Sequence, residues 1–241
     1  MDFYKLLSEF YDELFPVNPG EMDFLIGQVT GAGRILDVGC GTGNKTILFK
    51  DAAEKVFGAD IDRNMLEKAR AKHSAANVFY LERGLGDLGG EFEACSLDAV
   101  LCLGNVLPHL NSLAKIQEAL LEICGILRDG GKIILQILNY DRIIRGKIED
   151  LPLLESGNVK FFRRNEWRGE QMFFITTLKL KNSDEEYSGG NPFYALTRKE
   201  LEQSLALAGF EEVEFFGNFS GGAWNENSFL SLVIARKPRA V

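Results

Sequence analysis

Positive charge is scarce in this 241-residue chain, which has 27 lysines and arginines against 35 aspartates and glutamates, a formal net charge of −8. Because phosphate binding draws on dense lysine and arginine, this shortage argues against nucleic acid as a partner. No uninterrupted apolar run approaches the length that spans a membrane, and the first residues show no basic stretch followed by an apolar one. We therefore expect a soluble, cytoplasmic protein that binds neither nucleic acid nor membrane.

Cysteine and histidine are also few. The four cysteines, at positions 40, 95, 102 and 124, are scattered without any C-x-x-C pair. We expect them to be reduced, and we predict no metal site. Of the two histidines, His73 follows Lys72 at the end of a predicted surface helix, where we expect it to be solvated. His109 follows a predicted strand and is the candidate for acid–base chemistry.

The strongest motif is a glycine turn. Residues 34–38 predict the end of a buried strand, glycines follow at positions 39, 41 and 43, and a helical pattern begins at Thr46. A strand, a glycine turn and a helix form the first half of a nucleotide-binding unit, and the glycines let a ligand touch the backbone. Dinucleotide sites have the spacing G-x-G-x-x-G, whereas here Asp37 precedes alternate glycines. That acid would repel a pyrophosphate and suits a ligand that carries an ammonium or sulfonium group.

A second acid ends the next predicted strand. Residues 55–60 finish in Asp60, 17 positions after Gly43. A carboxylate at such a strand tip can accept hydrogen bonds from both hydroxyls of a ribose. Asp62 has the position of an N-cap, for a helix predicted over 63–72. The two acids are therefore expected to differ in purpose, Asp60 serving a ligand and Asp62 a helix.

The segments 37–43 and 60–66 resemble the two signatures of the class I S-adenosylmethionine-dependent methyltransferases. The resemblance implies S-adenosyl-L-methionine as the cofactor and S-adenosyl-L-homocysteine as the product. It places Ile61 against the adenine. Where this family often has an acid after the third strand, the chain has Gly84, so the backbone of Gly84 and Leu85 is expected to make that contact.

The N-terminal segment 10–14 resembles one found ahead of the core in many small-molecule methyltransferases, where its tyrosine, here Tyr11, caps the cofactor site. The alternative is a tyrosine on a half-buried helix face. The cofactor-binding residues that these resemblances imply are Tyr11, Asp37, Gly39, Cys40, Gly41, Asp60, Ile61, Gly84, Leu85 and Leu103.

Two further patches, 102–110 and 139–141, resemble glycine and sarcosine N-methyltransferases. Carried over, Leu103 and His109 line the cofactor site and Asn105 touches the acceptor. Asn105 and His109 are thus the catalytic candidates, and Asn139 is a further acceptor contact; the alternative for His109 is a structural role in its loop. That group grips the substrate carboxylate with an arginine where this chain has Leu138, so glycine itself is not the expected acceptor.

Strands and helices alternate along the chain, which predicts an α/β fold with a parallel sheet. We predict a single domain over 1–241, with a Rossmann-like seven-stranded sheet of order 3-2-1-4-5-7-6 and helices on both faces. The first five strands are parallel and the C-terminal strand is antiparallel. An N-terminal helical cap covers 1–30, and a β cap is inserted over 139–192, with strands at 161–167 and 171–180 and a loop at 181–190.

Two surface features, the 217–227 connection and the arginines of the insertion, each allow two interpretations. The glycine-rich connection 217–227 carries Trp224, which is predicted to bind the acceptor as part of a lid, or else holds the final strand in place. The insertion carries arginines at positions 142, 145, 163, 164 and 168. They form a solvated face, or one of them reaches inward to an anionic acceptor.

The sequence therefore predicts a transferase that moves a methyl group from S-adenosylmethionine to nitrogen or oxygen of a small molecule. A non-catalytic sensor or scaffold that binds S-adenosylmethionine is the first alternative, and a methyltransferase that acts on another protein is the second. A homodimer is left open.

Overall fold

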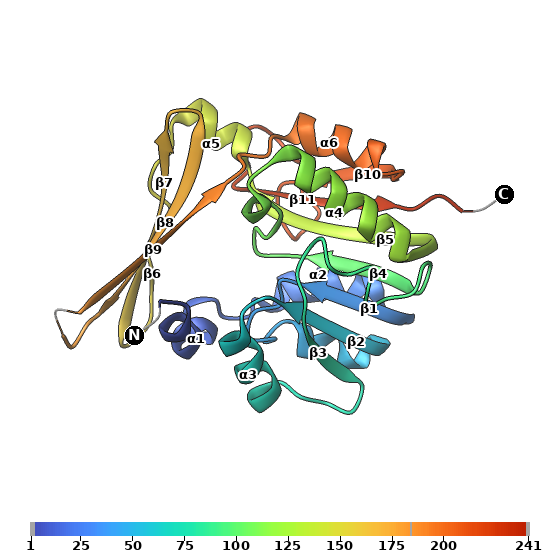
Figure 1. Cartoon of the computed structure of the whole chain (residues 1–241), viewed down its shortest axis with the longest axis horizontal. Coiled ribbons are helices and arrows are strands. Elements are labelled where there is room, and N and C mark those ends of the chain that lie inside the picture. Colours follow the sequence, from blue (N-terminus) through green and yellow to red (C-terminus); the bar gives the residue numbers. More distant parts are fainter. Residues whose placement is uncertain (1–2, 184, 240–241) are drawn as a thin grey trace.

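The computed structural model describes residues 3–183 and 185–239. Its centre is a seven-stranded sheet with the order β3-β2-β1-β4-β5-β11-β10 (Figure 1). Counting these strands in chain order gives 3-2-1-4-5-7-6, which confirms the predicted topology. The strands are β1 (Ala32–Val38), β2 (Ala53–Asp60), β3 (Val78–Glu82), β4 (Leu97–Cys102), β5 (Leu127–Leu138), β10 (Glu211–Phe216) and β11 (Leu230–Arg236).

The pairing of these strands fixes which edge of the sheet can hold a ligand. Strands β1 to β5 are parallel to one another, whereas β11 is antiparallel to both β5 and β10. The carboxyl ends of the first five strands therefore share one edge, and open α/β sheets bind ligands at that edge.

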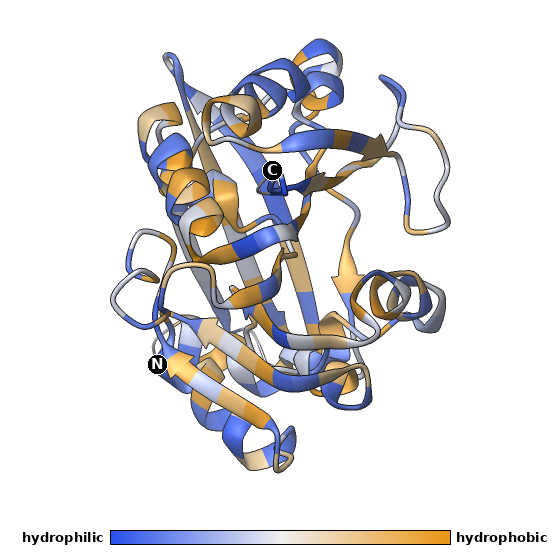
Figure 2. Cartoon of the chain, turned by 90° about the vertical axis from the view of Figure 1, so that its right-hand side faces the viewer, coloured by the Kyte–Doolittle hydropathy of each residue, from blue (hydrophilic) through white to orange (hydrophobic). Residues whose placement is uncertain are grey.

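Helices cover both faces of the sheet, as predicted. The side chains of β1 alternate between the faces: Leu36 and Val38 pack in one apolar cluster with helices α4 (Leu113–Ile126) and α6 (Arg198–Leu207). Ile35 packs in a second cluster with α2 (Pro19–Val29) and η1 (Thr46–Asp51). The helices carry hydrophobic and hydrophilic residues in the two-sided pattern of helices that cover a sheet (Figure 2).

Helix starts follow the capping signals of the sequence. Asp62 caps α3 (Arg63–Lys72) by accepting a hydrogen bond from the Met65 N–H at 3.0 Å, as predicted. Thr197 and Glu200 form a reciprocal capping box at the start of α6. The predicted helix after the glycine turn is the 3-10 helix η1, because β2 begins at Ala53 and leaves it only six residues.

The insertion forms a second, four-stranded antiparallel sheet, preceded by the short helix α5 (Tyr140–Gly146). Its strands, in spatial order, are β6 (Leu154–Glu155), β7 (Val159–Arg168), β8 (Gln171–Leu180) and β9 (Glu186–Phe193). The β7–β8 hairpin was predicted, but the loop predicted at 181–190 was wrong in its second half, which belongs to β9. Two glycines and Pro192 concealed this strand, and they are tolerated because β9 pairs only with β8, at the edge.

The second sheet stands beside the central one and reaches from the N-terminal helix α1 (Phe3–Leu14) to α5 (Figure 1). Near α1, Phe161 of β7 and Leu178 of β8 pack against Leu6 and Leu7. Toward α5, Phe193 of β9 joins the core between the central sheet and α4. The second sheet thus bridges α1 and the main core. In the part of the chain that the structure describes, no helix has the length and apolar character needed to cross a membrane.

Candidate active site

The glycine turn lies at the carboxyl edge of the central sheet, and each of its glycines has a left-handed backbone. The φ angles are 76° at Gly39, 56° at Gly41 and 72° at Gly43. A Cβ on Gly39 would lie 2.3 Å from Val106, and one on Gly43 would lie 2.4 Å from the Tyr80 hydroxyl. The turn therefore requires glycine both for its conformation and for the close approach of its neighbours.

Asp37 is buried directly before this turn, with 3% of its surface exposed. The Thr46 hydroxyl donates to its Oδ2 at 2.6 Å. Burial raises the pKa of Asp37 to about 6, against the opposing effects of Thr46 and Lys45. Lys45 itself pairs with Glu21 at 2.5 Å, and no described cation forms an ion pair with Asp37. The negative charge of Asp37 is therefore available to a cationic ligand.

Asp60 lies at the tip of β2, next to the same turn. Its Oδ2 accepts a hydrogen bond from the Gly41 N–H at 2.8 Å, and its Oδ1 accepts one from the Asp62 N–H at 2.9 Å. Partial burial raises the pKa of Asp60, while these two hydrogen bonds act to lower it. Each carboxylate oxygen keeps a further lone pair, so Asp60 is still able to accept hydroxyl donors, as the ribose prediction requires.

An apolar ledge follows Asp60. Ile61 is 78% exposed, and a Cβ on Gly84 would lie only 2.6 Å from its side chain. Leu85, the residue after Gly84, packs against the main core. The exposed Ile61 side chain lies against Gly84 and next to Asp60 at the strand tip, so it offers an apolar surface on which an aromatic base can pack. The three residues predicted for the adenine are thus brought together.

Tyr11 of α1 covers the glycine turn. A Cβ on Gly41 would meet the Tyr11 ring at 3.2 Å, and the ring centroids of Tyr11 and Phe15 are 4.8 Å apart. Burial, followed by the nearby negative charges of which Asp60 is the largest, raises the pKa of the Tyr11 hydroxyl. The position fits the predicted capping role. Cys40, at the centre of the same turn, is buried and its pKa is raised by that burial.

A network that the sequence did not predict fastens α1 to this turn. Asp12 accepts a hydrogen bond from the Thr42 hydroxyl at 2.5 Å through Oδ1, and its Oδ2 lies 3.1 Å from Nε2 of His73. The Tyr80 hydroxyl donates to the main-chain oxygen of His73 at 2.6 Å. The prediction of a solvated His73 was wrong, because its partner is 61 positions away in the chain. Asp12, Thr42 and His73 are called the α1 latch below.

Asn105 and Leu103 lie where β4 leaves the sheet. Leu103 is buried, and Asn105 has a left-handed backbone with φ of 68°. The side chain of Asn105 donates to the Tyr140 hydroxyl at 3.0 Å and accepts from the Leu138 N–H at 2.9 Å. It thereby joins the ends of β4 and β5. An acceptor contact for Asn105 stays a prediction.

His109 lies on the 3-10 helix η2 (Leu107–Leu110), which follows the turn whose Val106 touches Gly39. Its ring is 4.1 Å from that of Phe193, which in turn stacks on Phe174 at 4.8 Å. Desolvation beside these apolar rings lowers the pKa of His109 from 6.5 to about 4, although the residue as a whole is exposed. The direction of the shift is enough to leave the imidazole neutral at pH 7.

Asn139 and Trp224 were predicted to bind the acceptor, but the structure engages both in holding the 217–229 connection. Asn139 is fully buried, and its amide nitrogen donates to the main-chain oxygen of Ser228 at 2.9 Å. The Trp224 indole donates to Ser231 of β11 at 2.8 Å, and Arg198 of α6 lies 4.6 Å from its ring. These contacts favour the alternative in which Trp224 holds the final strand.

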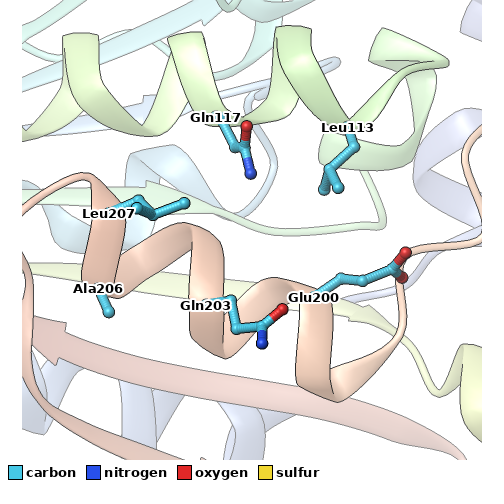
Figure 3. A pocket seen from close by; sticks show the side chains of 6 residues that line it. All are labelled: Leu113, Gln117, Glu200, Gln203, Ala206 and Leu207. Atoms are coloured by element: carbon cyan, nitrogen blue, oxygen red, sulfur yellow. The ribbon is translucent and has the colours of Figure 1, made fainter.

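A hollow of about 470 Å³ lies elsewhere, between α4 and α6. Figure 3 shows Leu113 and Gln117 of α4 pointing toward α6 across it. Its lining is Leu113, Gln117, Glu200, Gln203, Ala206 and Leu207. None of these is a predicted site residue, and Glu200 is occupied by its capping box. We therefore place the candidate site at the strand ends, where the two acids and Ile61 meet, and not in this hollow.

Known methyltransferases resemble this chain in sequence and in fold. The family model described as a methyltransferase domain matches residues 35–131, which include all of the predicted cofactor residues except Tyr11. A glycine/sarcosine N-methyltransferase of Parasynechococcus marenigrum is 36% identical over 159 residues, covering 60% of this chain and 54% of that protein. The chain spans about half the length of the relatives of this kind that it matches.

Solved structures share the fold over nearly the whole chain. An S-adenosylmethionine-dependent methyltransferase of Clostridium acetobutylicum has a TM-score of 0.82 at 15% identity, covering 98% of this chain and 100% of that one. An amino pentose methyltransferase of Micromonospora echinaspora, solved with S-adenosylmethionine bound, has a TM-score of 0.72 at 22% identity and covers 95% of each chain. Residues 35–131 therefore match the methyltransferase-domain family model, and the chain has the fold of the S-adenosylmethionine-dependent methyltransferases.

Proposed function

We propose that the protein transfers a methyl group from S-adenosylmethionine to nitrogen or oxygen of a small molecule. The observation that carries the proposal is the pair of acids, Asp37 and Asp60, that flank a glycine turn without any described ion-pair partner. Next to them, Ile61 offers an exposed apolar surface. This combination matches a ligand with a cationic amino-acid part, a ribose and an aromatic base.

S-adenosylmethionine, when bound, supplies an electrophilic methyl group on a sulfonium. In this proposal Asp60 accepts hydrogen bonds from the ribose hydroxyls and Ile61 carries the adenine beside Gly84. Asp37 provides negative charge for the amino-acid part, and Tyr11 closes over the turn. Holding donor and acceptor at near-attack distance supplies most of the acceleration that such a displacement needs.

His109 is the group in this region that can take up a proton from the acceptor. Its lowered pKa keeps it neutral, so its nitrogen lone pair is free at physiological pH. A general base contributes typically about 10²- to 10⁴-fold in rate when its pKa lies near the working pH, and the lowered pKa of His109 makes it a weak base with a contribution toward the lower end. The tilted contact with the Phe193 ring, at 4.1 Å between centroids, restricts the orientation of the imidazole. We assign His109 the role of base or acceptor-orienting group, with Asn105 as a second acceptor contact.

The relatives suggest which acceptors to try first. The matched bacterial protein is a glycine/sarcosine N-methyltransferase, and the structural neighbour from Micromonospora is an amino pentose methyltransferase. Small amines are therefore the first class of candidate, and hydroxyl acceptors are the second. Helix α1 and the second sheet would act as a cap over the acceptor, within one domain. A homodimer and a cytoplasmic location stay predictions.

The test has two parts. Calorimetric titration with S-adenosylhomocysteine should show binding to the wild type and a roughly ten- to hundredfold loss of affinity in a folded Asp60→Ala variant, because hydrogen bonds to a charged acceptor are lost. Release of S-adenosylhomocysteine from S-adenosylmethionine should then depend on an added small amine or alcohol. Binding without turnover across such a panel would favour the sensor alternative, and unchanged affinity in Asp60→Ala would remove the site assignment.

A further inference from the structure

Among the arginines of the insertion, Arg163 lies on the inner face of the second sheet. Along β7, Val159, Phe161 and Asn165 are buried, and Arg163 lies on the same face, between the last two. Arg164, one position on, faces outward and pairs with Glu149. Because successive side chains of a strand point to opposite faces, the strand presents one arginine to solvent and the other to the interior.

The interior that Arg163 faces leads to the glycine turn. The Arg163 guanidinium lies 6.0 Å from the ring of Phe15, at the end of α1. The Phe15 ring is 4.8 Å from Tyr11, and Tyr11 covers Gly41. Arg163 is therefore separated from the predicted cofactor site by two aromatic rings, on the side of the second sheet.

The guanidinium of Arg163 lacks the partners that its neighbours have. One of its nitrogens, Nη2, donates to the main-chain oxygen of Pro152 at 2.9 Å, while Nε is enclosed by protein without an acceptor. No carboxylate forms an ion pair with it among residues 3–183 and 185–239, whereas Arg145, Arg164 and Arg168 each pair with a glutamate. Burial lowers the pKa of Arg163.

A half-buried guanidinium that makes one hydrogen bond to the protein, of the five it can donate, gains from binding an anion. Arg34 also has an enclosed Nε, but it lies near the start of β1, at the opposite edge of the sheet from the glycine turn. Arg163 is thus the arginine whose unmet bonds lie beside α1 and the second sheet, the elements proposed to cover the acceptor.

We propose that Arg163 binds a carboxylate on the methyl acceptor and so selects acidic acceptors. The planar fork of a guanidinium matches a carboxylate in two parallel hydrogen bonds. The inference rests on the proposed function for the position of the methyl donor. The acceptor is favoured over the cofactor as the source of the carboxylate, because Tyr11 and Phe15 stand between Arg163 and Gly41.

The experiment follows the Arg163 side chain directly. In ¹⁵N-labelled protein, the Nε–Hε signal of Arg163 is assigned by its absence in Arg163→Lys. Benzoate is then titrated in, with benzamide as the neutral match, in the presence and absence of S-adenosylhomocysteine. Benzoate should move the signal in a saturable way and benzamide should not. Affinity for benzoate should fall roughly tenfold or more in Arg163→Gln.

Arg164→Gln is the matched control, since it removes a charge from the outer face of the same strand and should bind benzoate like the wild type. Equal benzoate affinity in Arg163→Gln and the wild type, both folded, would overturn the proposal. So would a signal that S-adenosylhomocysteine alone moves while it blocks benzoate, because the carboxylate would then be the cofactor's. Failure of S-adenosylhomocysteine to bind by calorimetry would count against the proposed function, and the benzoate titration without it would still report on Arg163.

Discussion

Burial of the ionised Asp37 carboxylate lowers the stability of the ligand-free protein, and a bound cationic ligand should offset this loss. Its pKa is raised by burial from 3.8 to about 6. A group with a raised folded-state pKa contributes stability that is present below the unfolded value and lost as the pH rises through the folded value. This rise in pKa corresponds to about 3 kcal/mol of unfolding free energy. Above pH 6, then, the ligand-free protein carries this cost, and a bound ammonium or sulfonium offsets it.

Asp37→Asn should therefore unfold at higher urea concentration than the wild type at pH 8 without ligand, and the difference should shrink as the pH falls toward 5. The amide oxygen is still able to accept from Thr46, so the hydrogen bond survives. With S-adenosylhomocysteine the order should reverse, because the variant loses the charge that the ligand needs. Paired urea titrations at the two pH values, with and without ligand, measure this. A variant that is less stable than the wild type at pH 8 without ligand contradicts it.

His109 gives a second residue-scale prediction, on rate. With a pKa lowered to about 4, the imidazole stays neutral from pH 8 down to about 5. The ratio of the wild-type rate constant to that of His109→Gln, at saturating substrates, should therefore be flat through pH 6.5, where an unperturbed histidine would titrate. Taking the ratio cancels the ionisation of the acceptor. A ratio that halves near pH 6.5 would show a histidine with an ordinary pKa, and a ratio of one at every pH would leave His109 a structural role.

At the scale of elements, the α1 latch ties the N-terminal helix to the glycine turn. Asp12 is its centre, since it contacts both Thr42 and His73. Asp12→Ala should free α1, so that its amides exchange faster and S-adenosylhomocysteine binds several-fold to tenfold more weakly, as the loss of one or two partly exposed hydrogen bonds implies. Hydrogen exchange and calorimetry measure the two effects. Glu13→Ala removes an exposed acid from the next position and should change neither.

Local sequence patterns predicted some of these structural elements and missed others. Local patterns predicted the glycine turn, the Asp62 cap and the order of the central strands, since each depends on neighbours within a few residues or on general rules of connection. Strand β9 was missed because pairing with β8 overrides the poor strand propensity of its glycines. The α1 latch and the loop-holding role of Asn139 were missed because their partners are distant in the chain.

On the scale of the whole molecule, α1 and the end of the second sheet that packs on it form a unit with its own apolar cluster, whereas Met172 and Phe193 at the other end of that sheet belong to the main core. Leu6, Leu7, Phe161 and Leu178 share a cluster that is separate from the two clusters on the faces of the central sheet. Yet this unit carries Tyr11, Asp12 and Arg163, which all lie toward the glycine turn or above it. We therefore expect this unit to be less firmly attached than the central sheet, which holds most of the predicted cofactor residues.

Phe161→Ala tests this division. Phe161 is 3% exposed, and its ring lies 5.9 Å from that of Phe15 in α1. Truncating a buried phenylalanine costs about 3–5 kcal/mol. If the unit opens on its own, the amides of α1, β7 and β8 should exchange faster together, while those of β1 and β4 keep wild-type protection, and S-adenosylhomocysteine should bind more weakly. Phe162→Ala, at a 43% exposed position on the outer face of the same strand, is the control and should leave all of these unchanged. Equal acceleration of exchange in both sheets would mean instead that the protein opens as one cooperative unit, with the closing elements as firmly attached as the core.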